Sequence, residues 1–247
     1  MSTWLEGNVI ENRGWTEALF SLRVEAAPLA FEAGQFVRIA LDIDGERVAR
    51  PFSMVNAPGE PTLEFYGIVV PQGPLSPRLA RLRPGERLLV ASNPAGFLVL
   101  SEIPAAETLW LMSTGTGIAP FISMLRAGTP WERFQNVVLV HAVRHAPELV
   151  YRDDIERAGA SHGSRFVYVP VVSREDVPGT LRGRIPALVR DARLEAQAGR
   201  ELFPDTSQVM LCGNPDMLKD TTAVLSERGM RKNRRRTPGH ITLESFW

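Results

Sequence analysis

The sequence predicts an all-β antiparallel barrel followed by an α/β domain with a doubly wound parallel sheet. Residues 4 to about 100 contain short runs of alternating apolar and polar residues separated by turn residues, which is typical of antiparallel strands. From about Pro104 onward, short apolar runs alternate with helical segments, which is typical of a parallel sheet with helices on both faces. We therefore place the domain boundary between residues 1–103 and residues 104–247.

The strands predicted for the first domain lie between clear turn signals. In chain order they cover residues 4–10, 19–24, 36–41, 62–70 and 87–90. The run 19–24 alternates cleanly, as a half-buried strand should, and residues 42–45 form a hairpin signal that ends in Asp44-Gly45. Short strands at this spacing favour a closed antiparallel barrel.

The second domain has four predicted strands, and a helix follows each of them. The strands cover residues 108–112, 137–142, 166–172 and 208–211, and the helices cover residues 121–125, 147 to about 157, 185 to about 198, and 216–228. The run 108–112 is almost continuously apolar, as expected of a strand buried on both faces. The first helix opens at Pro120 and stops at Gly128.

The amino-acid composition excludes several classes of function. The chain has 247 residues, of which 44% are hydrophobic and 23% charged, which is typical of a soluble globular protein. Basic and acidic residues number 28 each, and this balance argues against bulk nucleic-acid binding. One cysteine excludes an internal disulfide framework and any Cys-ligated zinc or iron–sulfur cluster within this chain. Because no run has the length of a signal peptide core or a membrane span, we expect a cytoplasmic protein with no membrane partner.

Four consecutive residues after the third strand combine four useful chemistries. Arg50 offers a fork of donors that suits a phosphate, and Pro51 stiffens the backbone. Phe52 offers a flat apolar face, and Ser53 a small hydroxyl that donates or accepts. A flat ligand that carries phosphates, such as a flavin nucleotide, needs all of these. The alternative is an exposed arginine followed by an ordinary barrel strand.

A second candidate for phosphate binding is the loop of residues 73–76. Gly73 allows backbone to approach a ligand closely, and Ser76 is predicted to cap a short helix whose first position is Pro77. Free N–H groups at such a helix start favour an anion. The alternative is a plain capped connector.

In the second domain, every suggestive residue follows a predicted strand directly. These residues are Gly115, Thr116, Gly117, Arg144, Ser173, Arg174, Cys212, Gly213 and Asn214. Ligands of open α/β sheets bind outside the carboxyl ends of the strands, so this placement predicts a binding site there. The glycine motif departs from the usual dinucleotide fingerprint, because Pro120 stands where a third glycine or alanine is usual.

The nature of the nucleotide is predicted from charge. A 2′-phosphate needs arginine and no nearby carboxylate. Arg144, Arg174 and Arg184 lie in or just after the loops at this edge, and Ser173 adds a hydroxyl. No acidic residue follows the 137–142 strand directly, although Glu175 lies beside Arg174. We therefore predict NADP(H) in preference to NAD.

Taken together, these motifs resemble those of the ferredoxin/flavodoxin–NADP reductase family. The resemblance rests on Arg-x-aromatic-Ser at 50–53, Gly-x-x-Ser at 73–76, Gly-Thr-Gly-Ile-Ala-Pro at 115–120 and Cys-Gly-Asn-Pro at 212–215, and it covers the whole chain. The tail of residues 234–247, which ends in an aromatic residue, resembles the compact bacterial members of the family. The resemblance implies an FAD-binding barrel, an NADP-binding α/β domain and a tail that returns to FAD.

The resemblance also implies roles for individual residues. The implied FAD-binding residues are Arg50, Pro51, Phe52, Ser53, Tyr66, Ile68, Val69, Gly73, Leu75, Ser76, Thr116 and Trp247. The implied NADP-binding residues are Gly115, Gly117, Val143, Arg144, Ser173, Arg174, Arg184, Gly213, Asn214 and Asp216. Phe52 would lie against the flavin ring and Ser53 near its N5, while Cys212 would face the nicotinamide. Phe52 departs from the family, which commonly has tyrosine there, so one hydroxyl contact is lost.

The function implied is hydride transfer between NADP(H) and FAD, and transfer of single electrons between FAD and ferredoxin or flavodoxin. Ser53, Cys212 and Glu244 are the candidate catalytic residues, and Glu244 would assist protonation near the flavin. One alternative is a reductase component of an oxygenase, or a free-flavin or ferric reductase of the same fold. A second alternative is a non-catalytic electron-transfer subunit.

The expected carrier protein is acidic, so a basic docking face is needed. The only dense basic run is residues 231–236. This run either docks the carrier, grips cofactor phosphates or is a solvated loop. We expect the protein to act as a monomer.

Overall fold

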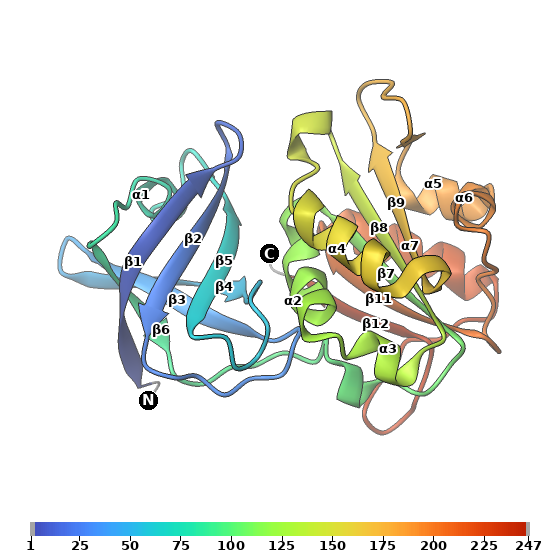
Figure 1. Ribbon diagram of the computed structural model, residues 1–247, viewed down its shortest axis with the longest axis horizontal. Helices are drawn as coiled ribbons and strands as arrows, with labels where there is room; N and C mark the ends of the chain where they lie inside the picture. The colour runs from blue at the N-terminus through green and yellow to red at the C-terminus, as the bar shows by residue number, and fades with distance from the viewer. Residues whose placement is uncertain (1–2, 246–247) are drawn as a thin grey trace.

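The first half of the chain forms an antiparallel sheet of six strands that curls into a barrel. In the computed structural model, which describes residues 3–245, the strand order is β4-β3-β6-β1-β2-β5 (Figure 1). The strands are β1 (Trp4–Gly14), β2 (Leu19–Ala26), β3 (Phe36–Ile43), β4 (Glu46–Ser53), β5 (Thr62–Ile68) and β6 (Arg87–Ala91). The two edge strands meet where Met54 bridges Phe65 and the Val55 N–H donates to the Glu64 carbonyl oxygen at 2.8 Å. The predicted barrel is confirmed.

Alternation in the sequence explains the barrel's interior. Leu22 and Val24 on β2, Ile39 on β3 and Val90 on β6 are each fully buried, and these strands pair through their backbones. Because successive side chains of a strand point to opposite faces, the polar residues between them, such as Arg23, face solvent. The barrel core is therefore filled by side chains, and any ligand must bind at the barrel's edge.

The second half is a parallel sheet of six strands in the order β10-β9-β8-β7-β11-β12 (Figure 1). The strands are β7 (Thr108–Thr114), β8 (Asn136–Val143), β9 (Phe166–Val172), β10 (Leu181–Arg182), β11 (Ser207–Gly213) and β12 (Ile241–Ser245). The four predicted strands are all present. The sequence reading missed β10, which has only two residues, and β12, which lies in the tail.

Helices cover both faces of this sheet, as predicted. Helices α2 (Ala119–Ala127), α3 (Pro130–Arg133) and α4 (Arg152–His162) bury one face, and α5 (Ile185–Arg190), α6 (Arg193–Ala198) and α7 (Pro215–Glu227) bury the other. The barrel adds α1 (Ser76–Leu79), and single 3-10 turns lie at η1 (Leu100–Glu102), η2 (Gly115–Ile118), η3 (Ala146–Glu148) and η4 (Gly163–Arg165). Among residues 3–245, no helix combines the length and the apolar character that a bilayer span requires.

Three local predictions are wrong. The helix predicted over residues 185–198 is two helices, because Ala192 adopts a left-handed conformation with φ of 56°. The helix predicted from Pro147 begins only at Arg152, after Tyr151 with φ of 59°. Ser76 does not cap α1: its Oγ instead accepts a hydrogen bond from the Val70 N–H at 2.8 Å.

The order of the strands places one crevice in the parallel sheet. From β7 the chain proceeds to β8, β9 and β10 on one side, and it then returns to place β11 and β12 on the other side. The connections therefore diverge between β7 and β11, and ligands of open parallel sheets bind at this kind of switch point. The loops concerned are those that begin at Gly115 and Asn214.

Candidate functional site

A cavity of about 490 Å³ lies where the barrel meets the first loop of the parallel sheet. Its wall contains ten of the predicted FAD-binding residues: Arg50, Pro51, Phe52, Ser53, Tyr66, Ile68, Gly73, Leu75, Ser76 and Thr116. Pro74 of the predicted loop 73–76 also lines it, and so do Gly67, Val70 and Ala119, which were not predicted. We call this the barrel cavity. Its volume lies within the usual range of small-molecule sites.

The position of the Phe52 ring is fixed by its neighbours on β5. Phe52 stands edge-on to Phe65, with ring centroids 6.4 Å apart. A Cβ built on Gly67 would lie 2.8 Å from the Phe52 ring, so only glycine lets the ring lie this close to β5. The Phe52 ring therefore presents a flat apolar surface at the end of the barrel. It is supported by β5 and is open to the cavity.

Two hydroxyl groups in the cavity wall have no hydrogen-bond partner among residues 3–245. These are the hydroxyls of Ser53, a residue that is 5% exposed, and of Tyr66, which is 3% exposed. Native proteins seldom leave buried polar groups unpaired, because each such group costs free energy. A ligand that carries several donors and acceptors would satisfy both hydroxyls, and this fits the chemistry of a flavin.

The outer end of the cavity is polar. Arg50 is exposed, and the only side-chain hydrogen bond that it makes among the described residues runs from Nη1 to the carbonyl oxygen of its neighbour Ala49 at 2.7 Å. Gly73 and Ser76 form the facing loop. A free guanidinium opposite a loop with accessible backbone is suited to a phosphate or pyrophosphate.

The switch point of the parallel sheet is tightly packed, backbone against backbone. A Cβ built on Gly117 would lie 2.4 Å from the Cys212 carbonyl oxygen, and one built on Gly213 would lie 2.2 Å from Thr114 Oγ1. Thr114 Oγ1 also accepts a hydrogen bond from the Asn214 N–H at 2.9 Å. The loops after β7 and β11 therefore form one unit, and Thr116 in that unit faces the barrel cavity.

Comparison with known proteins places this geometry in a family. The chain is 49% identical over 248 residues to a flavodoxin/ferredoxin–NADP reductase of Escherichia coli strain K12, with complete coverage of both chains. It is 37% identical over 254 residues to a ferredoxin–NADP reductase of Pseudomonas aeruginosa, covering 99% of this chain and 98% of the relative. The chain belongs to the flavodoxin/ferredoxin–NADP reductase family.

Family models and a solved structure agree with this assignment. Residues 9–98 match the oxidoreductase FAD-binding domain, and residues 111–223 match the oxidoreductase NAD-binding domain. The crystal structure of a ferredoxin NADP⁺ reductase from Neisseria gonorrhoeae with bound FAD and NADP superposes with a TM-score of 0.94 at 31% identity, with both chains fully covered. The resemblance inferred from the motifs is confirmed. The boundary at residue 103 lies between the two matched ranges and stays a prediction.

In this member of the reductase family, Cys212 and Glu244 are direct neighbours across β11 and β12. Burial raises the pKa of the Cys212 thiol, and the Glu244 carboxyl adds to the effect. The thiol is fully buried in the apolar cluster that contains Tyr66, and it does not line the barrel cavity. Burial also raises the pKa of Glu244 to about 7.

The Glu244 carboxyl reaches the barrel through Gly96. A Cβ built on Gly96 would lie 2.9 Å from Glu244 Oε1 and 3.3 Å from the Phe36 ring, and Phe36 is the strand partner of Ser53. The three predicted catalytic residues therefore lie on adjoining segments, although they come from opposite halves of the chain. Glu244 Oε2 is buried without a hydrogen-bond partner among the described residues.

The predicted NADP-binding residues after β8 and β9 are held together by backbone hydrogen bonds. The Ser173 N–H and Oγ donate to the Val143 carbonyl oxygen at 3.0 and 3.1 Å, and the Arg174 N–H donates to the Arg144 carbonyl oxygen at 3.1 Å. Arg184 follows directly at the start of α5. The guanidinium groups of the three arginines are exposed, and none has an ion pair within residues 3–245.

Glu175 does not oppose these arginines. Its Oε1 accepts a hydrogen bond from the Ala146 N–H at 2.6 Å and lies 3.6 Å from His145 Nδ1. Its charge is thus directed to the β8 loop rather than to Arg174.

Three further residues were predicted to bind a cofactor, namely Asn214, Val69 and Trp247. Asn214 caps α7, because its side-chain oxygen accepts the N–H groups of Asp216 and Met217 at 2.9 and 3.2 Å, so that oxygen is already engaged. Val69 packs against the barrel core, and its neighbour Val70 lines the cavity in its place. Trp247 lies outside the described residues; β12 ends at Ser245, paired with Gly213 at the switch point.

Proposed function

We propose that the chain is an FAD-dependent flavodoxin/ferredoxin–NADP reductase. It transfers hydride between NADP(H) and FAD, and single electrons between FAD and a ferredoxin or flavodoxin. The observation that carries the proposal is the barrel cavity, whose wall combines Phe52, Ser53 and Tyr66 of the barrel with Thr116 of the parallel sheet. The relatives named above carry this activity in their names, and the solved relative was crystallised with FAD and NADP.

Different residues of the barrel cavity bind different parts of FAD. Phe52 supports the ring system, the Ser53 hydroxyl donates to or accepts from its polar edge, and Arg50 with the loop 73–76 holds the pyrophosphate. When bound by these residues, FAD would supply the redox chemistry, namely hydride exchange with the nicotinamide and single-electron exchange with the carrier. The protein orients the rings, excludes water from the apolar wall and keeps a protonatable carboxyl, Glu244, beside the strand partner of Ser53.

The test of the reaction is the visible spectrum of the purified protein before and after NADPH. We expect flavin bands that bleach on addition of NADPH, and steady NADPH oxidation when an artificial electron acceptor is present. A colourless protein that needs added flavin would favour the free-flavin reductase alternative. A yellow protein that does not oxidise NADPH would favour a non-catalytic electron-transfer subunit.

We also propose that NADP(H) is preferred over NAD(H), because Arg144, Arg174 and Arg184 present unpaired guanidinium groups at one edge of the sheet. Replacing Arg174 or Arg184 by alanine should raise KM for NADPH by about tenfold, since a hydrogen bond to a charged group contributes roughly 1.5–3 kcal/mol. KM for NADH should change little. Equal effects on both nucleotides would contradict the assignment.

The carrier, in this proposal, is an acidic protein that docks on the loop of residues 231–236. Asn233 anchors the loop: its side-chain nitrogen donates to Glu102 O at 2.7 Å, and its side-chain oxygen accepts the Gly239 N–H at 3.1 Å. The five basic side chains around it are exposed, and Arg235 pairs with Glu102. The loop precedes β12 and so lies at the opposite end of the strands from the predicted NADP-binding loops, which favours docking over gripping of NADP phosphates.

Salt and charge substitutions test the docking proposal. The rate of carrier reduction should fall as ionic strength rises, because association between opposite charges is screened. Arg234→Gln should slow carrier reduction without changing the rate with a small artificial acceptor. Arg81→Gln on the barrel, also exposed, is the matched control. A rate independent of salt and of Arg234 would reject this face.

The remaining parts of the proposal follow from composition. We propose a monomeric protein of the cytoplasm that binds neither nucleic acid nor membrane, since the chain has no net charge and only one cysteine.

A further inference from the structure

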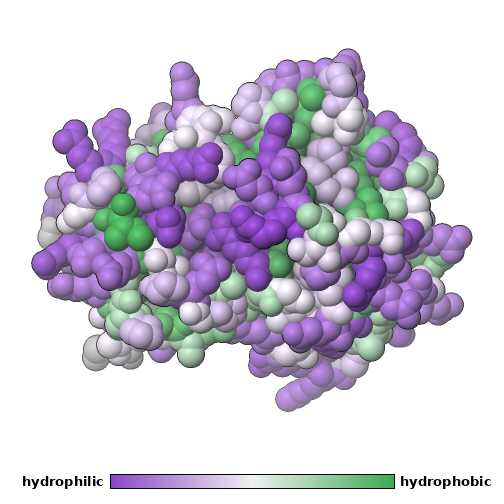
Figure 2. Space-filling model, viewed as in Figure 1, coloured by the Kyte–Doolittle hydropathy of each residue, from purple (hydrophilic) through white to green (hydrophobic). Residues whose placement is uncertain are grey.

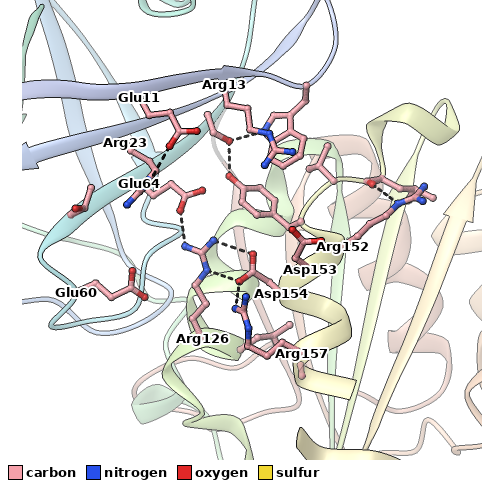
Figure 3. A pocket seen from close by; sticks show the side chains of 18 of the residues that line it. Glu11, Arg13, Arg23, Glu60, Glu64, Arg126, Arg152, Asp153, Asp154 and Arg157 are labelled. Atoms are coloured by element: carbon pink, nitrogen blue, oxygen red, sulfur yellow. Dashed lines mark hydrogen bonds and ion pairs between the residues drawn. The ribbon is translucent and has the colours of Figure 1, made fainter. Parts of the chain in front are cut away.

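A second and larger cleft lies on the other side of Tyr66 from the barrel cavity. It has a volume of about 970 Å³ and lies between strands β1, β2 and β5 of the barrel and helices α2 and α4. Charged side chains of both signs surround it, including Glu11, Arg23 and Arg152 (Figure 3), and hydrophilic residues dominate the face between the two halves of the molecule (Figure 2). We call it the charged cleft. The activity proposed above makes no use of it.

Three aromatic rings connect the two cavities. The Tyr66 ring lies in the wall of the barrel cavity, while Tyr151 and Trp15 line the charged cleft. The ring centroids of Tyr66 and Tyr151 are 5.3 Å apart, and those of Tyr151 and Trp15 are also 5.3 Å apart. These are contact distances for aromatic pairs. Tyr66 and Tyr151 are buried and Trp15 is half-buried, so the path leads from the interior to solvent.

The hydrogen bonds along this path differ from ring to ring. Within the described part of the chain the Tyr66 hydroxyl has no hydrogen-bond partner, whereas the Tyr151 hydroxyl shares a hydrogen bond of 2.7 Å with Ser21 Oγ. Trp15 Nε1 donates to the same Ser21 Oγ at 2.7 Å. An oxidised tyrosine persists only if it releases its proton, and no group among residues 3–245 is placed to receive the proton of Tyr66, so the electron vacancy passes through Tyr66 without staying there. An indole can lose an electron and keep its proton. Trp15 is therefore the residue that remains oxidised.

We propose that Tyr66, Tyr151 and Trp15 form a one-electron path through which a light-excited flavin in the barrel cavity draws an electron from the charged cleft. This proposal depends on the FAD binding proposed above. In the overall step the flavin gains one electron and Trp15 loses one, and the Nε1 proton stays on Trp15, held by Ser21. A small reductant in solution, such as ascorbate, then returns one electron to Trp15 and is itself oxidised. The net result is flavin reduction that needs light but no NADPH.

Arg13 controls how readily Trp15 gives up its electron. Its guanidinium carbon lies 3.6 Å from the centre of the Trp15 ring. A cation over an indole stabilises the electron-rich ring and opposes the positive charge that oxidation creates. Arg13→Gln should therefore increase the yield of oxidised Trp15, the opposite of what a variant that merely damages the fold would do.

The experiment uses the FAD-loaded full chain, a pulse of blue light, and no NADPH. The measured quantity is the visible absorption of the indole radical, together with flavin bleaching in the presence of ascorbate. We expect the radical in the wild type and in Trp4→Phe, and its loss in Trp15→Phe and Tyr151→Phe. Trp4 is a matched control because it lies on β1, the strand that ends directly before Trp15, and also has an arginine, Arg47, over its ring at 5.3 Å.

Two outcomes overturn the path. One is an indole radical that persists in Trp15→Phe, and the other is its absence from a wild-type protein that is yellow and bleached by NADPH. An Arg13→Gln protein with an unchanged or lower yield likewise counts against it. A chain that binds no FAD at all rejects the proposed function instead, so the two failures are distinguishable.

Discussion

At the scale of single residues, the Ser53 hydroxyl indicates that the cavity binds a ligand. Ser53 lies at the end of β4 and is 5% exposed, its hydroxyl has no hydrogen-bond partner in the part of the chain that the structure describes, and it faces a cavity with an apolar wall. An unpaired buried hydroxyl lowers the stability of the free protein, and it gains its partner only when the ligand binds.

Replacing Ser53 by alanine should therefore affect two measurements differently. The free energy of unfolding of the FAD-free protein should stay the same or rise, because a partnerless polar group is removed. The Kd for FAD should rise by roughly fivefold, which corresponds to about 1 kcal/mol for one lost hydrogen bond. Urea unfolding and FAD titration provide the two values. Destabilisation of the FAD-free protein would show that the hydroxyl has a structural partner.

Glu244 gives a prediction about pH. Burial raises its pKa from the ordinary 4.5 to about 7. Between these values the folded chain keeps a proton that the unfolded chain has released, so stability falls as pH rises from 4.5 to 7 and the loss is complete above pH 7. A shift of this size corresponds to about 3 kcal/mol.

The check is Glu244→Gln, which removes the titrating group. The difference in unfolding free energy between variant and wild type should increase by about 3 kcal/mol in favour of the variant between pH 4.5 and pH 8. Glu46→Gln, an exposed position on β4, controls for the change of one charge. Parallel pH curves for wild type and Glu244→Gln would contradict the buried carboxyl.

At the scale of elements, Arg126 ties the two halves of the chain together. It lies on α2, and its Nη1 is 2.6 Å from Glu64 Oε2 on β5 (Figure 3). Its Nε and Nη2 bind the two carboxylate oxygens of Asp154 on α4 at 2.9 and 3.0 Å. All three side chains are at most 18% exposed. The helix that follows the Gly115–Ile118 turn is thereby held against the strand that carries Tyr66.

Arg126→Met should destabilise the protein by about 3–5 kcal/mol, because it leaves the buried Glu64 carboxylate without its ion pair and leaves Asp154 paired only with Arg157. The matched control is Arg23→Met, which breaks a pair with Glu11 in which both side chains are about half exposed and should cost less than about 1 kcal/mol. Urea unfolding of both variants measures the difference. Equal losses would show that the Arg126 pairs contribute no more than a surface ion pair.

At the scale of the whole molecule, the barrel cavity takes its wall from both halves. A ligand bound there stabilises barrel and parallel sheet together, by about 2.7 kcal/mol when its free concentration is 100 times Kd. We therefore expect FAD to raise the temperature of a single unfolding transition as its concentration increases. ADP, which lacks the flavin ring, should raise it less. Two transitions of which FAD shifts only one would contradict a site shared by the two halves.

The sequence by itself determined the two architectures, because periodicity is a local property. The alternation at 19–24 and the continuous apolar run at 108–112 predict their strands from nearest neighbours alone. The same holds for Gly128, which ends α2 in a left-handed conformation with φ of 73°. Many candidate site residues of the second domain could be predicted too, because they follow the carboxyl ends of predicted parallel strands, where ligands of such sheets bind.

The remaining features of the fold and of the candidate site were decided only by tertiary structure, because they depend on groups far apart in the chain. Tyr151 breaks the predicted helix and hydrogen bonds to Ser21, 130 residues away, and no local pattern signals that contact. Whether Val69 or Val70 faces the cavity depends on how β5 ends, and Ser76 bonds to Val70 rather than capping its helix. β12 becomes a strand only because β11 offers it a free edge, and this pairing brings Glu244 beside Cys212. Long-range pairing of this kind is settled by the free energy of the whole fold, so short windows of sequence do not contain it.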